Sequence, residues 1–524
     1  MARLPLVCAL VFAWWSGVLC PPVDAQAAGE NAQNPIIWAD VPDPSVIRVG
    51  DTYYMSSTTM HMAPGVPIMT STNLVDWELA GYVYDQLANA DALFMRQGQN
   101  AYGRGSWASS LRYHDGTFYL AVFSYTTGET YIYSTGDVEN GPWHKEALGD
   151  LYHDQSLFFD DDGRVYLVYG GGGDFQIIEL KADLTGVKRG GVRRTLIEDV
   201  GSPAGDDLGL HGEGAQLFKV DGTYYLFLIA WPRGGMRTVV VQKAESLGGP
   251  WEGRVVLQDE GVAQGGIVDT PDGDWYALMF GDRGAVGRIP YLIPLTWSDD
   301  GWPVLGVDGE VPETLDIPSD GTGASGIVAS DEFDGDTLRP EWQFNHNPEG
   351  RLWSVTERPG YFRLRTGRLD ESFVGARNSL TQRTYGPQSG AETALDVSGL
   401  NDGDVAGLGL LAADYGYVGV TKEGGQTSVV MVAFRDGEAQ TVERVPFVGD
   451  TVHLRAHADF RDRADDGTFF YSLDGETWTP IGDTLEMRYT LQHFMGYRFA
   501  LFAYATETPG GTADFDFFRL DPAP

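Results

Sequence analysis

The sequence predicts an all-β protein, a five-bladed β-propeller followed by a β-sandwich of jelly-roll or lectin type. Glycine is frequent, at 68 of 524 residues, which suits a chain rich in turns. Clear helical periodicity over a long stretch is absent from the sequence. Five segments instead repeat a turn signal followed by an aromatic strand start, the pattern of a β-hairpin. These segments are Gly50–Tyr54, Asp115–Tyr119, Asp162–Tyr166, Asp221–Tyr225 and Asp272–Tyr276.

The spacing of these hairpins is typical of propeller blades. Their final tyrosines are separated by steps of 65, 47, 59 and 51 residues. A blade of four short strands takes about 40–50 residues, and loop insertions account for the longer steps. Because a propeller gathers its innermost strands around one central cavity, residues shortly before each hairpin are expected to face that cavity.

Three carboxylates stand at corresponding places in the repeats. Asp43 lies eleven residues before the tyrosine of its hairpin, and Asp154, Glu213 and Gln264 lie twelve before theirs. In the second repeat, Ser109–Ser110 come nearest to this position. One such aspartate alone would indicate a turn cap. Three acids in one register on different blades predict a functional cavity, because converging carboxylates perturb one another's pKa.

The chain divides into four predicted parts. Residues 1–27 are a signal peptide, with a basic start, an apolar run over Leu4–Trp15 and small residues at the cleavage sites. Residues 34–318 are the propeller and 319–329 a linker rich in glycine and serine. Residues 330–524 carry many short alternating strands, which indicates the sandwich.

Composition and charge restrict the partners and the compartment. Both cysteines, Cys8 and Cys20, fall within the predicted signal, and Gly17–Leu19 is a poor approach to a lipoprotein cysteine. The formal net charge of −38 repels nucleic acids and anionic membranes, and no later segment is long and apolar enough to span a bilayer. We expect a secreted protein, extracellular or periplasmic, that acts on a neutral substrate.

Five motifs resemble glycoside hydrolase family 43, and the arrangement with a C-terminal sandwich is similar to its β-xylosidases and α-L-arabinofuranosidases. The motifs are Pro42–Ser45, Asp154–Phe158, Gly212–Gly214, Gln264–Pro271 and Gly287–Pro290. The resemblance covers nearly the whole chain after the predicted signal. It implies hydrolysis of a terminal xylose or arabinose from plant cell-wall oligosaccharides or polysaccharides, with inversion and without a required cofactor.

The resemblance also implies roles for the three acids. Asp43 would be the general base that activates water, Glu213 the general acid, and Asp154 the group that raises the pKa of that acid and orients it. An inverting pair must stand about 6.5–9.5 Å apart to admit water beside the sugar. An acid must also stay protonated near neutral pH, which burial and a nearby negative charge favour.

Other residues are implied to contact the sugar. Arg288 would bind it in the pocket, and Gln264 would line the same cavity. Trp107 is a candidate stacking wall, with blade packing as the alternative. Phe494 is a candidate for an aromatic residue that the sandwich sends into the pocket, with sandwich core as the alternative.

Metals, rival functions and assembly stay open at this stage. Relatives often carry a histidine where this chain has Ala263, which argues against an axial calcium ion. Sandwiches of this type can bind a structural calcium ion, and Asp331 and Asp514 are its candidate ligands, with solvated turn acids as the favoured alternative. An endo-arabinanase, a different exo-glycosidase and a sugar-binding propeller without activity are the rival interpretations. The sequence does not determine the oligomeric state.

Overall fold

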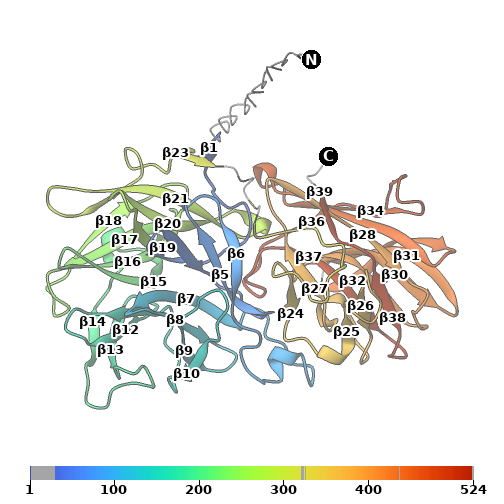
Figure 1. Ribbon diagram of the computed structural model, residues 1–524, viewed down its shortest axis with the longest axis horizontal. Coiled ribbons are helices and arrows are strands. Elements are labelled where there is room, and N and C mark those ends of the chain that lie inside the picture. Colours follow the sequence, from blue (N-terminus) through green and yellow to red (C-terminus); the bar gives the residue numbers. More distant parts are fainter. Residues whose placement is uncertain (2–29, 320, 322–323, 325, 436, 522–524) are drawn as a thin grey trace.

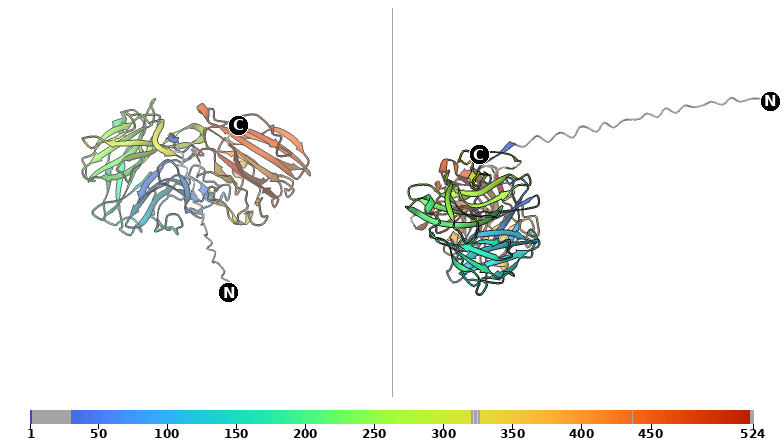
Figure 2. Two further views of the ribbon diagram at one scale, coloured as in Figure 1. Left: turned by 45° about the horizontal axis from the view of Figure 1, so that its top comes forward. Right: turned by 90° about the vertical axis from the view of Figure 1, so that its left-hand side faces the viewer.

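The computed structural model describes residues 1, 30–319, 321, 324, 326–435 and 437–521 and has the predicted all-β architecture. The propeller, coloured blue to yellow-green in Figure 1, lies beside the sandwich, coloured orange to red. Figure 2 shows the same two bodies from two further sides. Apart from Met1, the predicted signal peptide lies outside the described residues.

Five antiparallel sheets of four strands form the blades. In chain order they comprise β2 (Ser45–Val49), β3 (Thr52–Ser56), β5 (Gly65–Ser71) and β6 (Glu78–Tyr84); β7 (Ser106–His114), β8 (Thr117–Ser124), β9 (Glu129–Thr135) and β10 (His144–Ala147); β11 (Ser156–Phe159), β12 (Val165–Tyr169), β13 (Phe175–Leu180) and β14 (Arg193–Ile197); β15 (Leu208–Val220), β16 (Thr223–Pro232), β17 (Thr238–Ala244) and β18 (Glu252–Leu257); and β19 (Ala263–Asp269), β20 (Trp275–Asp282), β21 (Arg288–Trp297) and β22 (Pro303–Leu305). The first strand of each blade is innermost, and these five strands contact one another in a closed ring. A short ladder of β1 (Glu30–Gln33) with β23 (Thr314–Ser319) joins the two ends of the propeller segment.

Strand pairing fixes the register of the inner strands and corrects the one expected from sequence. Opposite the five hairpin tyrosines lie Ile47, Arg112, Phe158, Phe218 and Val268. Four residues before these, in the same order, are Asp43, Ala108, Asp154, Gly214 and Gln264. Glu213 therefore precedes this ring by one residue, and Ala108 takes the place expected of Ser109–Ser110. The hairpin loops of blades III and V are longer than those of the other three, so counting back from the tyrosine shifts the register by one.

The serines two residues after this ring connect neighbouring blades. Ser45 Oγ accepts a hydrogen bond from the backbone N–H of Leu111 on the next blade, at 3.0 Å. Ser110 does the same for Leu157, at 3.0 Å, and Ser156 for Leu217, at 2.9 Å. All three hydroxyls are buried, so each bond satisfies two groups that would otherwise be costly to bury. The repeated Asp-x-Ser pattern is thus explained by packing between blades as well as by the cavity.

Arg112 links three blades below the ring. Its guanidinium donates to Ser156 Oγ at 2.9 Å and to Gln216 Oε1 at 3.0 Å, and also to its neighbour's carbonyl, Leu111 O, at 2.7 Å. These partners belong to three different blades. Burial lowers the pKa of Arg112 to about 10, which leaves it positively charged near neutral pH. The positive charge of Arg112 therefore lies where the inner strands of the propeller converge.

Replacement of this cation should destabilise the propeller. We expect Arg112→Met to lower the free energy of unfolding by about 2–4 kcal/mol, because buried acceptors on two blades lose a charged donor. Urea unfolding followed by tryptophan fluorescence measures the change. The exposed Arg189→Met is the matched control, and an Arg112→Met protein with the wild-type unfolding midpoint would contradict this account.

The sandwich consists of two large antiparallel sheets, and one of them includes a strand of the propeller. The first sheet has the order β32-β31-β30-β29-β37-β27-β24-β4, where β4 (Met62–Ala63) comes from blade I. The other members are β24 (Gln343–Asn345), β27 (Leu380–Arg383), β29 (Asp404–Leu411), β30 (Gly416–Glu423), β31 (Gln426–Arg435), β32 (Glu438–Phe447) and β37 (Arg498–Ala505). The second sheet contains β25 (Trp353–Ser354), β26 (Phe362–Arg365), β28 (Gln388–Asp396), β33 (Thr451–Asp459), β34 (Asp466–Ser472), β35 (Thr479–Pro480), β36 (Leu485–Glu486), β38 (Thr512–Phe515) and β39 (Arg519–Asp521).

Alternation of apolar and polar residues places the sandwich core. Along β33, Val452, Leu454, Ala456 and Ala458 are buried, while the residues between them are partly exposed. The resulting apolar core is continuous with that of blades IV and V, so the two domains pack as one unit. The helices of the described residues are single 3₁₀ turns, and none is long and apolar enough to cross a membrane. They are η1 (Ala92–Phe94), η2 (Ser202–Ala204), η3 (Gly284–Val286), η4 (Gly350–Leu352), η5 (Phe373–Gly375) and η6 (Arg461–Arg463).

Candidate active site

The ring of residues at the tips of the inner strands lines a narrow crevice on the propeller axis. The crevice is bounded by Asp43, Ala108, Asp154, Gly214 and Gln264 with their neighbours. Asp43, Asp154 and Gln264 have φ values of 52°, 46° and 57°, a left-handed conformation that is unfavourable for residues with a Cβ. Such conformations concentrate at functional sites, where the surrounding structure holds them in place.

Asp43 is buried and paired with a buried arginine. Its Oδ1 accepts a hydrogen bond from Arg288 Nη1 at 2.8 Å, and its Oδ2 accepts one from Thr58 Oγ1 at 2.6 Å. Both charged side chains are only 5% exposed. In the described part of the chain, Arg288 Nε and Nη2 have no hydrogen-bond partner. Because an unsatisfied buried donor is costly, these two N–H groups are suited to bind a hydroxyl of a ligand.

Asp154 lies across the ring on blade III. Its Oδ2 accepts a hydrogen bond from the backbone N–H of Gly214 at 2.9 Å, and the side chain is 5% exposed. Burial raises the pKa of Asp154 to about 7; the neighbouring His153 opposes this shift, while the carboxylates of Glu213 and Asp43 add to it. A carboxyl group that titrates near neutral pH in a cavity is a feature of acid–base sites.

Glu213 differs from the other two acids because β15 is irregular at this point. The pairing of β15 with β16 shifts on both sides of Glu213, as in a β-bulge. Its side chain is 32% exposed, against 5% for Asp154. Gly214 follows with φ +71°, and a Cβ there would stand 2.7 Å from the side chain of Gln264. The bulge thus directs one acid of the trio toward solvent, where a ligand can reach it.

His153 is a site residue that the sequence interpretation missed. Its Nε2 lies 3.4 Å from Glu213 Oε2 and 3.8 Å from Asp154 Oδ2, and its Nδ1 lies 3.0 Å from Tyr125 Oη. Burial opposes the charged imidazolium, but the carboxylates of Asp154, Glu213 and Asp43 outweigh burial and raise the pKa of His153. The sequence feature that could have identified His153 is its position directly before Asp154 in the motif.

Trp107 and Phe494 form an aromatic wall beside the acids. Their rings stack with centroids 4.8 Å apart and planes inclined by 21°. The guanidinium of Arg288 lies over the Phe494 ring, 4.7 Å from its centroid. The structure therefore brings the sandwich residue Phe494, the propeller residue Trp107 and the pair of Arg288 with Asp43 to one place.

Asp40 fixes the loop that carries Phe494. Its Oδ1 accepts a hydrogen bond from Arg288 N at 2.8 Å, and its Oδ2 accepts one from Gly496 N at 3.0 Å. The backbone N–H of Phe494 donates to Thr490 O at 2.8 Å. One buried carboxylate thereby links the arginine of the site to the aromatic wall, although Asp40 itself lies outside the ring register.

The two aspartates proposed as calcium ligands have other partners. Asp331 accepts hydrogen bonds from Phe333 N at 2.9 Å and Trp342 Nε1 at 2.8 Å. Both oxygens of Asp514 accept bonds from the guanidinium groups of Arg358 and Arg363, at 2.6–2.7 Å. A carboxylate neutralised by two arginines does not suit a cation, so the contacts argue against the predicted calcium site.

One cluster of metal-ligating side-chain types does gather in the described residues. His153, Asp154 and Glu213 offer atoms that lie within 4.8 Å of one another. Calcium prefers six to eight oxygen ligands, which this set does not supply. His153 and Asp154 thus lie beside Glu213, the exposed acid of the trio.

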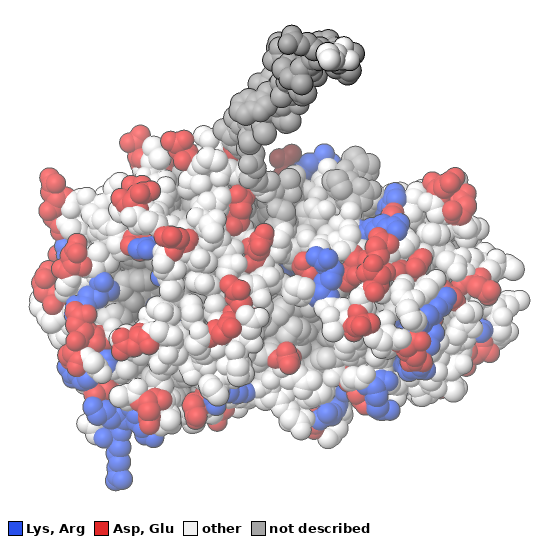
Figure 3. Space-filling model, in the orientation of Figure 1, with Lys and Arg blue, Asp and Glu red and all other residues white. Residues whose placement is uncertain are grey.

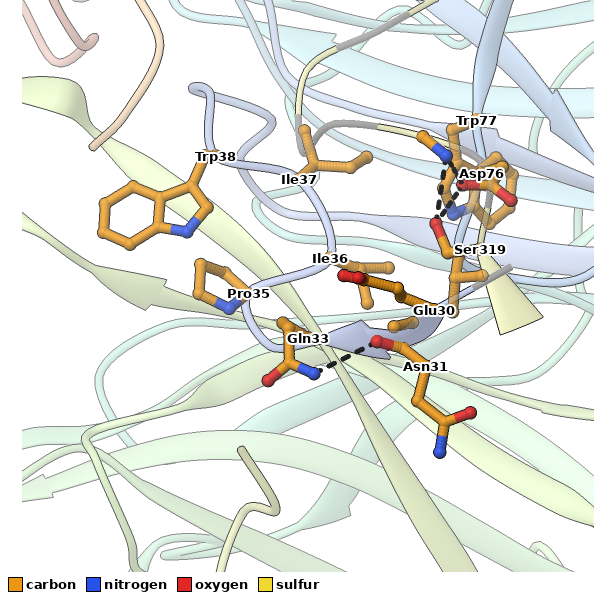
Figure 4. A pocket seen from close by; sticks show the side chains of 13 residues that line it. Glu30, Asn31, Gln33, Pro35, Ile36, Ile37, Trp38, Asp76, Trp77 and Ser319 are labelled. Carbon is orange, nitrogen blue, oxygen red and sulfur yellow. Dashed lines mark hydrogen bonds between the residues drawn. The ribbon is translucent and has the colours of Figure 1, made fainter. Parts of the chain in front are cut away.

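A second hollow lies near the β1–β23 ladder, away from this cluster. Figure 4 shows its lining, which includes Glu30, Trp38 and Trp77. Several of its polar groups are bonded to one another: Ser319 Oγ donates to Asp76 Oδ1 at 2.5 Å, and Gln33 Nε2 donates to Asn31 O at 3.0 Å. None of the predicted site residues lines this hollow.

Comparison with known proteins agrees with the geometry of both domains. The family model described as "Glycosyl hydrolases family 43" matches residues 32–303. A second model, "Beta xylosidase C-terminal Concanavalin A-like domain", matches residues 330–521. The two matches coincide with the propeller and the sandwich.

Individual relatives cover most of the chain. It is 29% identical to a beta-xylosidase of Formosa agariphila, over 93% of this chain and 90% of that one. It is also 29% identical to a non-reducing end alpha-L-arabinofuranosidase of Bacteroides ovatus, over 81% and 83% of the two chains. A solved structure of a bifunctional GH43-CE protein of Bacteroides eggerthii is 54% identical, with a TM-score of 0.93 over 95% of this chain, which spans 64% of that structure's length. The chain belongs to the glycosyl hydrolases family 43.

Proposed function

We propose that this protein is an inverting exo-glycosidase that releases a terminal xylose or arabinose from plant hemicellulose or its oligosaccharides. The carrying observation is the convergence of Asp43, Asp154 and Glu213 beside an aromatic wall and a partly unsatisfied arginine. The names of the relatives, beta-xylosidase and alpha-L-arabinofuranosidase, supply the two candidate sugars.

Asp43 serves as the general base in this proposal. Its hydrogen bonds from Arg288 and Thr58 fix the carboxylate, which accepts a proton from the attacking water. The water oxygen forms a bond to the anomeric carbon on the face opposite the leaving oxygen, so the anomeric configuration inverts. The free N–H groups of Arg288 would hold the sugar hydroxyls that orient this carbon.

Glu213 serves as the general acid. It passes its proton to the glycosidic oxygen as the bond to the anomeric carbon breaks, and its partial exposure gives it access to that oxygen. Asp154 lies buried beside it, and burial together with the carboxylates of Glu213 and Asp43 raises the pKa of Asp154.

The aromatic wall favours removal of terminal residues over internal cleavage. Phe494 comes from the sandwich and stacks on Trp107 of blade II, so the cavity is bounded on that side by a second domain. An apolar ring face is suited to stack on the apolar face of a sugar. An endo-acting enzyme would instead need a trench open at both ends.

The surface suits a neutral substrate and an exported protein. Acidic side chains are spread over both domains on the face shown in Figure 3, in keeping with the net charge of −38. Such a surface repels phosphate backbones but not uncharged polysaccharide. We further propose that the apolar N-terminal segment directs secretion.

Hydrolysis of the 4-nitrophenyl glycosides of β-D-xylopyranose and α-L-arabinofuranose tests this function. We expect turnover of at least one substrate, with the inverted anomer visible first by NMR, and loss in Glu213→Ala that is larger for disaccharides than for nitrophenyl glycosides. Retention of configuration would overturn the mechanism. Inactivity on both sugars combined with internal cleavage of arabinan would instead identify an endo-acting enzyme.

A further inference from the structure

We propose that His153, together with Tyr125, forms a proton relay that returns a proton from solvent to Glu213 after each turnover. This inference rests on the proposed function, because it concerns the recovery of the general acid. His153 acts through Glu213 and is therefore a positioning residue rather than a group that touches the sugar.

The proton balance of an inverting reaction creates the need for such a relay. In each cycle Glu213 loses a proton to the leaving oxygen, and Asp43 gains one from water. The protein can act again only when Asp43 has released its proton and Glu213 has taken one up. Asp43 lies just before the inner strand of blade I and Glu213 lies on the inner strand of blade IV, so the return passes through solvent or through side chains.

The atoms of His153 are arranged for this transfer. Its Nε2 lies 3.4 Å from Glu213 Oε2, and its Nδ1 lies 3.0 Å from Tyr125 Oη. An imidazole can release a proton from one nitrogen while it accepts another at the second. His153 donates its Nε2 proton to the Glu213 carboxylate and takes the proton of the Tyr125 hydroxyl at Nδ1. The Tyr125 oxygen takes from solvent a proton that replaces the one Asp43 releases there. Both relay groups are then neutral, and His153 is in the opposite tautomer. Rotation of the hydroxyl and proton exchange with solvent then restore the starting state.

Tyr125 supplies the outer end of the path. Its residue exposure is 38%, whereas the side chain of His153 is 21% exposed. The ring of Tyr125 packs edge-on against Trp107, with centroids 5.1 Å apart, so the hydroxyl is held beside the aromatic wall. Solvent can therefore reach the phenol at the rim when a sugar covers Glu213 beneath it.

The histidine is held in one orientation by its surroundings. Its ring packs edge-on against Phe123, with centroids 5.2 Å apart. A Cβ on Gly171 would stand 2.7 Å from His153 Cδ2, so only glycine leaves room for the ring. The titratable groups that face the imidazole are Asp154, Glu213 and Tyr125, with Asp43 further across the crevice. The net negative surroundings raise the pKa of His153, which eases proton uptake from solvent.

The test compares leaving groups, since only a poor leaving group requires a proton from Glu213. The substrates are the disaccharide and the 2,4-dinitrophenyl glycoside of the pentose that the wild type prefers. We expect His153→Gln to lower kcat on the disaccharide by about 10–100-fold and on the dinitrophenyl glycoside by less than about threefold. Added imidazole buffer should restore part of the lost kcat in this variant and should leave the wild type unchanged.

Two further variants make the outcome decisive. Tyr125→Phe should show the same selective loss to a smaller degree, and the exposed His144→Gln should match the wild type. Equal loss on both substrates, or no loss and no response to imidazole, would overturn the relay. Glu213→Gln in the same assay distinguishes the two proposals: if it loses both substrates equally, the general-acid assignment itself fails, whatever His153 does.

Discussion

Asp43→Asn is expected to lower kcat by about 10²–10⁴-fold on every glycoside that the enzyme hydrolyses. The general base activates water irrespective of the leaving group, so a dinitrophenyl glycoside should lose as much rate as a disaccharide. This uniform loss separates the base from Glu213, whose removal should affect good leaving groups least. Kinetics on both substrates, with circular dichroism to verify folding, measure the effect.

The matched control for this change is another aspartate that pairs with an arginine. Asp269 bonds to Arg48 at the opposite end of the inner strands, and Asp269→Asn should retain wild-type kcat. A selective loss of the disaccharide in Asp43→Asn would show that Asp43 acts on the leaving group. The assignment of base and acid would then have to be exchanged.

The protein is expected to lose stability steeply as the pH falls below about 6.5, because three neutral histidines are buried between its domains. His61, His346 and His493 are each at most 2% exposed, and their rings surround Tyr102. Burial is the main cause that lowers the pKa of His346 and His493 to about 3, and it lowers that of His61 well below its usual range. The arginines that face this group, Arg498 and Arg368, act in the same direction.

The direction of this pH dependence follows from whether the folded or the unfolded state binds more protons. Between about pH 3 and 6.5 the unfolded histidines are protonated and the folded ones are not, so the free energy of unfolding falls as the pH falls. Well below pH 6.5, the three histidines together lower the free energy of unfolding by up to about 4 kcal/mol for each unit by which the pH falls. Buried carboxyls with raised pKa, such as Asp40, contribute with the opposite sign. The comparison of a variant with the wild type isolates the histidine contribution.

His61→Leu provides that comparison. Both ring nitrogens of His61 are buried without a hydrogen-bond partner among the described residues, so an apolar residue of similar size should be tolerated. We expect the pH slope between pH 6 and 4.5 to decrease by up to about 1.4 kcal/mol per unit, as measured by urea unfolding. The exposed His144→Gln should keep the wild-type slope. If His61→Leu also keeps it, His61 is already protonated in the folded state.

The local patterns of the sequence were sufficient for the architecture. Hairpin signals at blade spacing predicted the five-bladed propeller, and the many short alternating segments of residues 330–524 predicted the sandwich. Asp43 and Asp154 could be aligned because each opens an Asp-x-Ser motif whose serine joins neighbouring blades. These features depend on residues that are close in sequence, and they recur in each repeat.

Long-range contacts decided the details of the candidate site. The bulge in β15 displaced Glu213 from the ring and exposed it, and no count from the hairpin could reveal that shift. His153 meets Glu213 only because blades III and IV are adjacent, and its type alone did not distinguish it from a packing residue. Asp331 and Asp514 resembled cation ligands until the structure placed arginines and an indole N–H against them.

By itself, therefore, the sequence determined which segments form strands, how many blades the chain can build and which acids stand near the axis. The tertiary structure decided which of those acids is exposed, which histidine contacts it and that Phe494 lies beside the acids rather than in the sandwich core. The physical reason is that turn chemistry and apolar alternation act over a few residues. The contact of Phe494 with Trp107, by contrast, joins two domains through a loop that buried Asp40 holds in place.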